Sequence, residues 1–125
     1  MVILFVEEEE DIICFVKQVL ESYGHEVIKA VNGEEAIYAI KNRPGIQAVI
    51  TDYGMPKVDG FELVSFIRSQ AQGLKLPVVL CTGGGCVGSD KGKQFSQWGV
   101  VIVQKPYNIN ELLTALNVAV NNMAA

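Results

Sequence analysis

The sequence predicts an α/β domain in which helices cover both faces of a parallel sheet. Short apolar runs recur along the chain, amphipathic helical patterns separate them, and 125 residues is an ordinary length for one domain. Strands that are buried on both faces are continuously apolar, whereas half-exposed strands alternate between apolar and polar residues. A regular alternation of strand and helix requires right-handed crossovers, and these give a parallel sheet.

The apolar runs predict five strands. Four of the runs are almost wholly apolar, so these strands are expected to be buried, and the remaining run is more polar and is expected at an edge of the sheet. The buried strands are predicted at residues 2–6, 48–50, 77–81 and 100–103, and the edge strand at residues 26–31.

Apolar residues at helical spacing predict a helix after each strand. The helices are expected at residues 10–21, around residues 36–40, at residues 60–70, at about residues 89–98 and from residue 108 onward. Their expected ends are a C-terminal stop at Gly24, N-caps at Asn32 and at Asn108 with Glu111 in a capping box, and a turn at Asp59-Gly60.

The composition excludes several classes of function. A net charge of −4 offers no basic surface for nucleic acid, and no apolar run approaches the ~18 residues that span a bilayer. The three cysteines and the single histidine lack the spacing of a zinc site. The first residues lack the basic flank of a signal peptide. We therefore expect a cytoplasmic protein with reduced thiols, without membrane insertion or direct binding of nucleic acid.

Four of the predicted strands end in polar side chains, at the edge where open α/β sheets bind their ligands. The first strand ends at Glu7 and Glu8, the third at Asp52, the fourth at Thr82 and the fifth at Lys105. Clustered carboxylates repel one another unless a cation joins them, and hard oxygen ligands suit Mg²⁺. An ammonium and a hydroxyl nearby could hold a transferred phosphoryl group, whose nucleophile would be Asp52.

Four stretches of the chain form a recognisable series of motifs. They are residues 52–60, in which Asp52 precedes Met-Pro and then Asp-Gly, the first strand with its acidic pair at residues 3–9, the fourth strand ending in Thr at residues 77–83, and Lys105-Pro106-Tyr107. Together these stretches resemble the receiver domain of bacterial-type two-component response regulators. Single-domain chemotaxis regulators and the receivers of hybrid histidine kinases are similar. The likeness covers essentially the whole chain, in the same order and at the same spacing.

This resemblance implies a flavodoxin-like, doubly wound (βα)5 fold with three layers and the sheet order 2-1-3-4-5. One receiver domain would occupy residues 1–125, and Asp52 would accept phosphate from a histidine kinase or a phosphotransfer protein. Thr82 would bind a phosphoryl oxygen and Lys105 would pair with the phosphoryl group. The implied ligands of Mg²⁺ are Glu7, Glu8, Asp52 and the backbone carbonyl of Gly54. Phosphorylation would switch an output surface on the fourth helix, fifth strand and fifth helix, for partner binding or dimerisation.

The chain departs from the family pattern at three places. The acidic pair is Glu7-Glu8 rather than two aspartates or Glu-Asp, and each added methylene changes the reach toward an ion that demands a near-ideal octahedron. Ile102 stands where the family often has the aromatic residue of its switch, three residues before Lys105. The loop after Thr82 is rich in glycine and could either cradle a phosphoryl group or be mobile.

Three other functions have to be weighed at this level. The Glu7-Glu8 pair is compatible with a pseudo-receiver, an interaction module of the same fold that is never phosphorylated. A phosphatase with an Asp nucleophile would need an acid at position 54, which is glycine, and a flavin carrier would need a phosphate cradle where the two glutamates lie. We therefore expect no enzymatic activity beyond self-phosphorylation from a donor and slow self-dephosphorylation.

Overall fold

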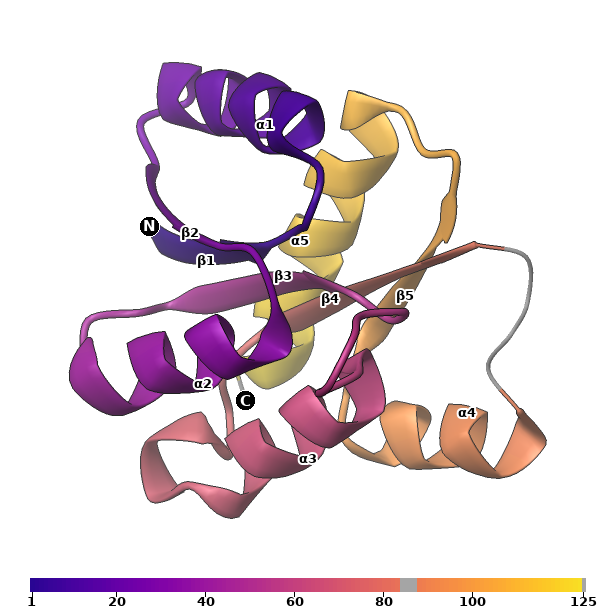
Figure 1. Cartoon of the computed structure of the whole chain (residues 1–125). Coiled ribbons are helices and arrows are strands. Elements are labelled where there is room, and N and C mark those ends of the chain that lie inside the picture. Colours follow the sequence, from indigo (N-terminus) through magenta and orange to yellow (C-terminus); the bar gives the residue numbers. More distant parts are fainter. Residues whose placement is uncertain (84–87, 125) are drawn as a thin grey trace.

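The computed structural model describes residues 1–83 and 88–124, and these form a five-stranded parallel sheet with helices on both faces (Figure 1). The strand order is β2-β1-β3-β4-β5, as the sequence comparison with receivers implied. The elements are β1 (Val2–Val6), α1 (Glu10–Ser22), β2 (Glu26–Ala30), α2 (Gly33–Asn42), β3 (Ala48–Asp52), α3 (Gly60–Ser69), a short 3-10 helix η1 (Ala71–Gly73), β4 (Val78–Gly83), α4 (Ser89–Gln97), β5 (Val101–Lys105) and α5 (Ile109–Met123).

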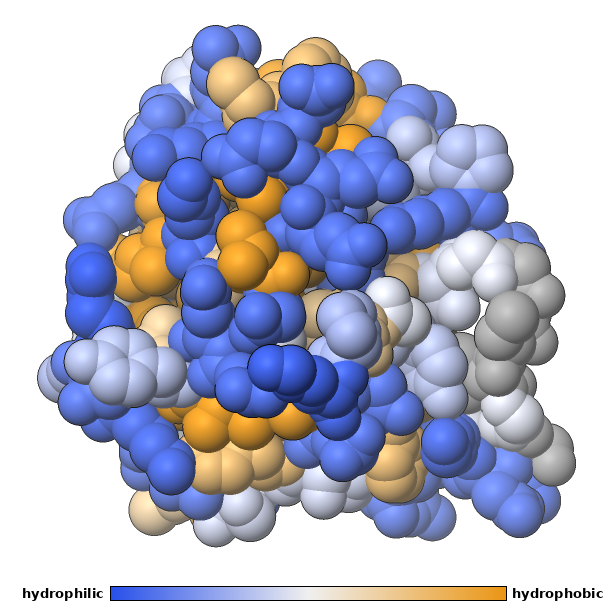
Figure 2. Space-filling view, in the orientation of Figure 1, coloured by the Kyte–Doolittle hydropathy of each residue, from blue (hydrophilic) through white to orange (hydrophobic). Residues whose placement is uncertain are grey.

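Two apolar cores lie on opposite faces of the sheet. Alternate residues of a strand point to opposite faces, so Ile3 and Phe5 of β1 join the core under α1 and α5. Leu4 and Val6 join the core under α2, α3 and α4. Figure 1 shows the resulting three layers, and hydrophilic side chains cover most of the face in Figure 2. In the described part of the chain, no helix has the length and apolar character needed to cross a membrane.

The predicted helix ends are confirmed. Gly24 follows α1 with a positive φ of 88°, a conformation in which glycine avoids the clash that a Cβ would meet. The side chains of Asn32, Asp59 and Asn108 each accept a hydrogen bond from a backbone N–H in the first turn of their helix. These caps satisfy donors that would otherwise have no partner within the helix.

The strand ends are confirmed within one residue, and one strand prediction was wrong. The strands β3 and β5 end at Asp52 and Lys105, and β4 continues to Gly83, one residue beyond Thr82. The fifth strand is not buried on both faces, since it forms the second edge of the sheet and leaves Ile102 43% exposed.

A close backbone contact fixes the start of α3 beside the end of β3. The N–H of Gly60 donates a hydrogen bond to the carbonyl oxygen of Tyr53 at 2.7 Å. A Cβ on Gly60 would lie 2.8 Å from the carbonyl oxygen of Asp52 and from the Cα of Tyr53, distances that real Cβ atoms essentially never have. Glycine is therefore required at this position, and the contact ties α3 to the strand end that carries Asp52.

Candidate functional site

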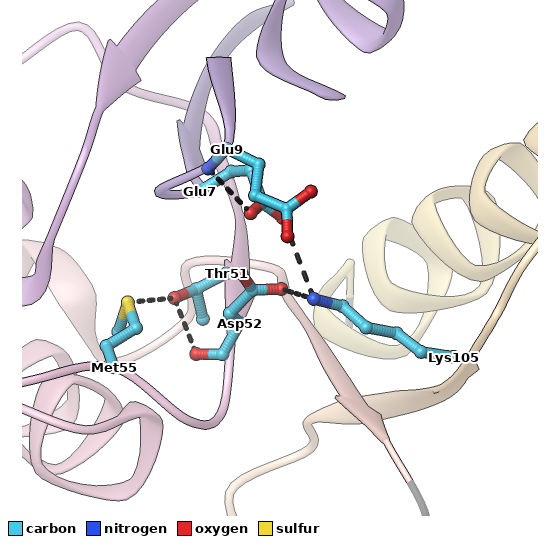
Figure 3. Close-up of polar contacts among 6 residues, drawn as sticks. All are labelled: Glu7, Glu9, Thr51, Asp52, Met55 and Lys105. Carbon is cyan, nitrogen blue, oxygen red and sulfur yellow. Dashed lines mark hydrogen bonds and ion pairs between the residues drawn. The ribbon is translucent and has the colours of Figure 1, made fainter. Parts of the chain in front are cut away.

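Three charged side chains from three elements meet at the carboxyl edge of the sheet. The ammonium Nζ of Lys105 lies 2.6 Å from Oδ1 of Asp52 and 3.7 Å from Oε1 of Glu7 (Figure 3). Asp52 ends β3, Lys105 ends β5, and Glu7 directly follows β1. The sequence predicted these positions at one edge, and the structure brings these three together.

Backbone hydrogen bonds hold Glu7 in place. Its N–H donates to the carbonyl oxygen of Ala30 at 2.9 Å, which extends the pairing of β1 with β2 by one residue. Its Oε2 accepts a hydrogen bond from the N–H of Glu9 at 3.1 Å. Glu7 is only 2% exposed, so its carboxylate is a fixed part of the site.

Burial dominates the electrostatics of Asp52. Desolvation raises the pKa of Asp52 to about 7, the hydrogen bond from Lys105 opposes this change, and the neighbouring Glu7 carboxylate adds to it. With both carboxylates ionised, Lys105 neutralises one of the two negative charges and the other remains. A proton or a cation is therefore favoured here.

The Lys105 ammonium remains charged in this setting. Burial alone would lower the pKa of Lys105, but the hydrogen bond to Asp52 and the charges of Asp52 and Glu7 raise it. A fixed positive charge beside the Asp52 carboxylate can offset negative charge that develops there during a reaction.

The other predicted site residues lie around this cluster. Thr82 is 6% exposed on β4, one residue beyond Cys81, which pairs with Asp52 across the sheet. Gly54 follows in the exposed turn after β3, and Glu8 is exposed beside Glu7. Within residues 1–83 and 88–124, no three acidic, histidine or cysteine side chains are close enough together to hold a metal ion. Most of the predicted glycine-rich cradle falls on residues 84–87, outside the described residues.

Two features next to Asp52 were not predicted from the sequence. The buried hydroxyl of Thr51 donates a hydrogen bond to the carbonyl oxygen of Asp52 at 3.0 Å and lies 3.9 Å from Sδ of Met55 (Figure 3). A hydroxyl in an otherwise apolar strand was the signal that could have revealed it. Lys91 Nζ lies 3.3 Å from the hydroxyl of Tyr53, a contact between distant segments that no local pattern indicates.

The sequence pattern of the response regulator receiver domain matches residues 3–117, which is nearly the whole chain. The chain belongs to the response regulator receiver family. Receivers of this family are signalling modules of two-component systems, not enzymes in the usual sense, and they interact with histidine kinases and output domains. The resemblance to receiver domains and the fold that it implied are thereby confirmed.

Individual relatives have low sequence identity to this chain, but the similarity extends over most of its length. The chain is 28% identical to a chemotaxis protein CheY homolog of Campylobacter jejuni, over 98% of this chain and 78% of that protein. It is 30% identical to the heme response regulator HssR of Staphylococcus haemolyticus, over 88% of this chain and 47% of that protein. This receiver therefore spans about half the length of the second relative.

Solved structures agree with the fold. A response regulator receiver domain protein from Clostridium thermocellum superposes with a TM-score of 0.84 at 28% identity, with 98% of this chain and 96% of that chain covered. The chemotaxis protein CheY4 of Vibrio cholerae gives a TM-score of 0.78 at 30% identity, with 93% and 95% covered. The receiver fold thus accommodates the Glu7-Glu8 pair without rearrangement of the sheet.

Proposed function

We propose that Asp52 is the phosphoacceptor of this receiver, and that residues 1–125 act as one phosphorylation-dependent switch. The observation that carries the proposal is the buried Asp52 carboxylate, 2.6 Å from the Lys105 ammonium at the carboxyl edge of the sheet. A carboxylate held beside a fixed positive charge has the chemistry of a nucleophile for phosphoryl transfer.

In the proposed reaction, an oxygen of Asp52 attacks the phosphorus of a phosphohistidine on a partner. A phosphorus–oxygen bond forms, the phosphorus–nitrogen bond breaks, and the imidazole leaves and takes up a proton. Lys105 offsets the charge on the phosphoryl oxygens, and the Thr82 hydroxyl donates a hydrogen bond to one of them. The proton that burial favours on Asp52 must be absent, because only the carboxylate is a nucleophile.

The donor set fits Mg²⁺ in its chemistry. The ion prefers hard oxygen ligands, and the Glu7 and Asp52 carboxylates together exceed the charge of Lys105. The proposed ligands are Glu7, Glu8, Asp52 and the carbonyl of Gly54. The three carboxylates do not lie together in the described structure, so the exposed Glu8 side chain would have to turn toward the other two when the ion binds. Bound Mg²⁺ would supply positive charge that offsets the negative charge of the phosphoryl oxygens. Because Glu8 is exposed, its carboxylate is the ligand whose contribution most needs an experiment.

A groove beside the acceptor suits a partner that carries the phosphohistidine. It lies between α1 and the start of α5, has a volume of about 860 Å³, and reaches Lys105. Phe15 lies in the wall of the groove and is 56% exposed. Exposure of an aromatic ring to water is unfavourable in free energy, and an apolar side chain of a partner would remove this cost by covering the ring. The other apolar residues that line the groove are Ile12, Val16, Pro106, Tyr107 and Ile109.

We place the output surface on the fourth helix, fifth strand and fifth helix. A second groove between β5 and α5 exposes Ile102 and Val118 at 43% and 42%. Apolar side chains on an edge strand and the adjacent helix suit an output domain, a target protein or a second receiver.

The decisive experiment is an intact-mass measurement after incubation with a small-molecule phosphodonor and Mg²⁺. We expect one added phosphoryl group on the wild-type receiver, none on Asp52→Asn, and none when EDTA removes the metal. Glu8→Gln should raise the Mg²⁺ concentration required, whereas Glu10→Gln, which removes an exposed carboxylate of α1, should not. If neither a small donor nor a histidine kinase labels the wild type, the chain is a pseudo-receiver.

Truncation of Phe15 should separate partner docking from chemistry. We expect Phe15→Ala to slow phosphotransfer from a histidine kinase or phosphotransfer protein by about 10-fold, since a buried aromatic anchor typically contributes more than about 1 kcal/mol to binding. Labelling by a small phosphodonor should be unchanged. Tyr38→Ala is the matched control, because Tyr38 is 70% exposed on α2, outside the groove. Equal slowing by both variants, or slowing with both donors, would contradict this assignment.

A further inference from the structure

We propose that Tyr53 and Lys91 form a latch that holds the N-terminal half of α4 against the strand end that carries Asp52, and that this latch transmits a change of charge at Asp52 to α4. Three features support the latch: the weak attachment of α4, the point at which α4 is pinned, and the covalent position of Tyr53. The latch goes beyond the proposed phosphorylation, because the change of charge at Asp52 can also be made by substitution.

The helix α4 has little apolar attachment to the rest of the molecule. Among its residues whose side chains are described, only Phe95 is buried. The remainder of the helix is rich in Lys, Gln, Ser and Gly, and the surface over it in Figure 2 is mostly hydrophilic. Elements with few buried apolar contacts open and shift at low cost in free energy.

The C-terminal end of α4 is nevertheless pinned. Arg68 of α3 donates hydrogen bonds from Nε and Nη2 to the carbonyl oxygen of Trp98, the residue that caps α4, at 3.0 and 2.9 Å. The ring of Trp98 also lies 5.4 Å from that of Phe61, centroid to centroid. Displacement of α4 is therefore easiest at its N-terminal half, with the pinned end as a pivot.

Lys91 connects the free half of α4 to Tyr53, and Phe95, nearer the pinned end, contacts the ring of the same tyrosine. The Nζ of Lys91 lies 3.3 Å from the Tyr53 hydroxyl, 5.9 Å from the centroid of the Tyr53 ring and 5.3 Å from that of Phe61. The Tyr53 ring packs edge-on against Phe95 at 6.3 Å and 80°. An ammonium at these distances is attracted by an aromatic ring.

Tyr53 is bonded directly to Asp52, and its backbone is held on both sides. Its N–H donates to the carbonyl oxygen of Cys81 at 2.8 Å, and its carbonyl oxygen accepts from Gly60 at 2.7 Å. The side chain of Tyr53 is therefore the part of this residue that can move when the charge at Asp52 changes. Lys91 is exposed, so its contact with the Tyr53 hydroxyl is weak, and a small displacement of the Tyr53 side chain is enough to break it.

Hydrogen exchange of the amides of residues 89–98 tests the latch without phosphorylation. We expect Asp52→Asn to change these exchange rates about threefold or more in the wild-type background. In the Tyr53→Phe and Lys91→Gln backgrounds the change should fall to less than half of this. Tyr53→Phe keeps the ring on Phe95, so folding is preserved. Lys93→Gln, on the same helix and exposed, should behave as wild type.

An equal response to Asp52→Asn in all four backgrounds, or no response in the wild type, would overturn the latch. The same comparison with a phosphodonor, checked by intact mass in the same samples, separates the two proposals. Labelling without a change in α4 exchange rejects the latch and leaves the phosphoacceptor role standing. Absence of labelling rejects that role, while the Asp52→Asn comparison still decides the latch.

Discussion

Replacing Asp52 with asparagine should make the stability advantage of the variant over the wild type grow as the pH rises. The difference in free energy of unfolding is expected to increase by about 2–3 kcal/mol between about pH 5 and about pH 8. The reason is that burial raises the pKa of Asp52 to about 7 in the folded protein, from an ordinary value of 3.8. This is the largest pH-linked effect that we expect at the site.

The sign follows from proton binding. Between the two pKa values the folded state holds a proton on Asp52 and the unfolded state does not, so stability falls as the pH rises through this range. The contribution is fully present below the unfolded value and is lost above about pH 7. Asparagine cannot ionise, so the variant escapes this loss.

Urea denaturation at a series of pH values measures the difference directly. Asp11→Asn is the matched control, because Asp11 is exposed in the first turn of α1, and its difference from wild type should stay nearly constant. A constant difference for Asp52→Asn as well would show that Lys105 compensates the buried charge completely. In that case, the excess negative charge of the site would have no energetic consequence.

Much of the fold could be predicted because its signals are local. Continuous apolar runs such as Val78 to Leu80 mark buried strands, and Asn32 and Asn108 mark helix starts through caps that need only four residues of sequence. Exposure of Ile102 was missed because an edge position depends on the strand order.

Some features of the site could likewise be predicted from the sequence, and others could not. That Asp52, Lys105 and Glu7 would share one edge follows from the carboxyl ends of parallel strands, and the structure confirms that they meet. The burial of Glu7 and the exposure of Glu8 could not be predicted from the sequence, because both depend on the path of the chain between β1 and α1. The contact of Lys91 with Tyr53 depends likewise on how α4 packs through Phe95.

Arg68 should be the side chain whose loss costs most among the polar residues away from the site. We expect Arg68→Met to lower the free energy of unfolding by about 2–4 kcal/mol, because three carbonyl oxygens lose their hydrogen bonds to the guanidinium. The carbonyl oxygen of Gly73 still accepts from the N–H of Leu76 at 3.4 Å. Arg68 is 9% exposed, and burial lowers the pKa of its guanidinium. It donates to the carbonyl oxygens of Gly73 at 2.7 Å, Leu76 at 2.8 Å and Trp98.

The pattern of donors explains why lysine should be a poor substitute. A guanidinium offers five N–H groups in a fixed fork and reaches carbonyls on η1, on the segment before β4 and at the end of α4, whereas an ammonium is a single point. Arg68→Lys should therefore recover only part of the loss. Arg43→Met, which removes an exposed ion pair with Glu26 at 3.6 Å, should cost less than about 0.5 kcal/mol. If urea denaturation gives equal losses for Arg68→Met and Arg43→Met, Arg68 does not pin α4. The pivot on which the Tyr53–Lys91 latch depends would then be lost with it.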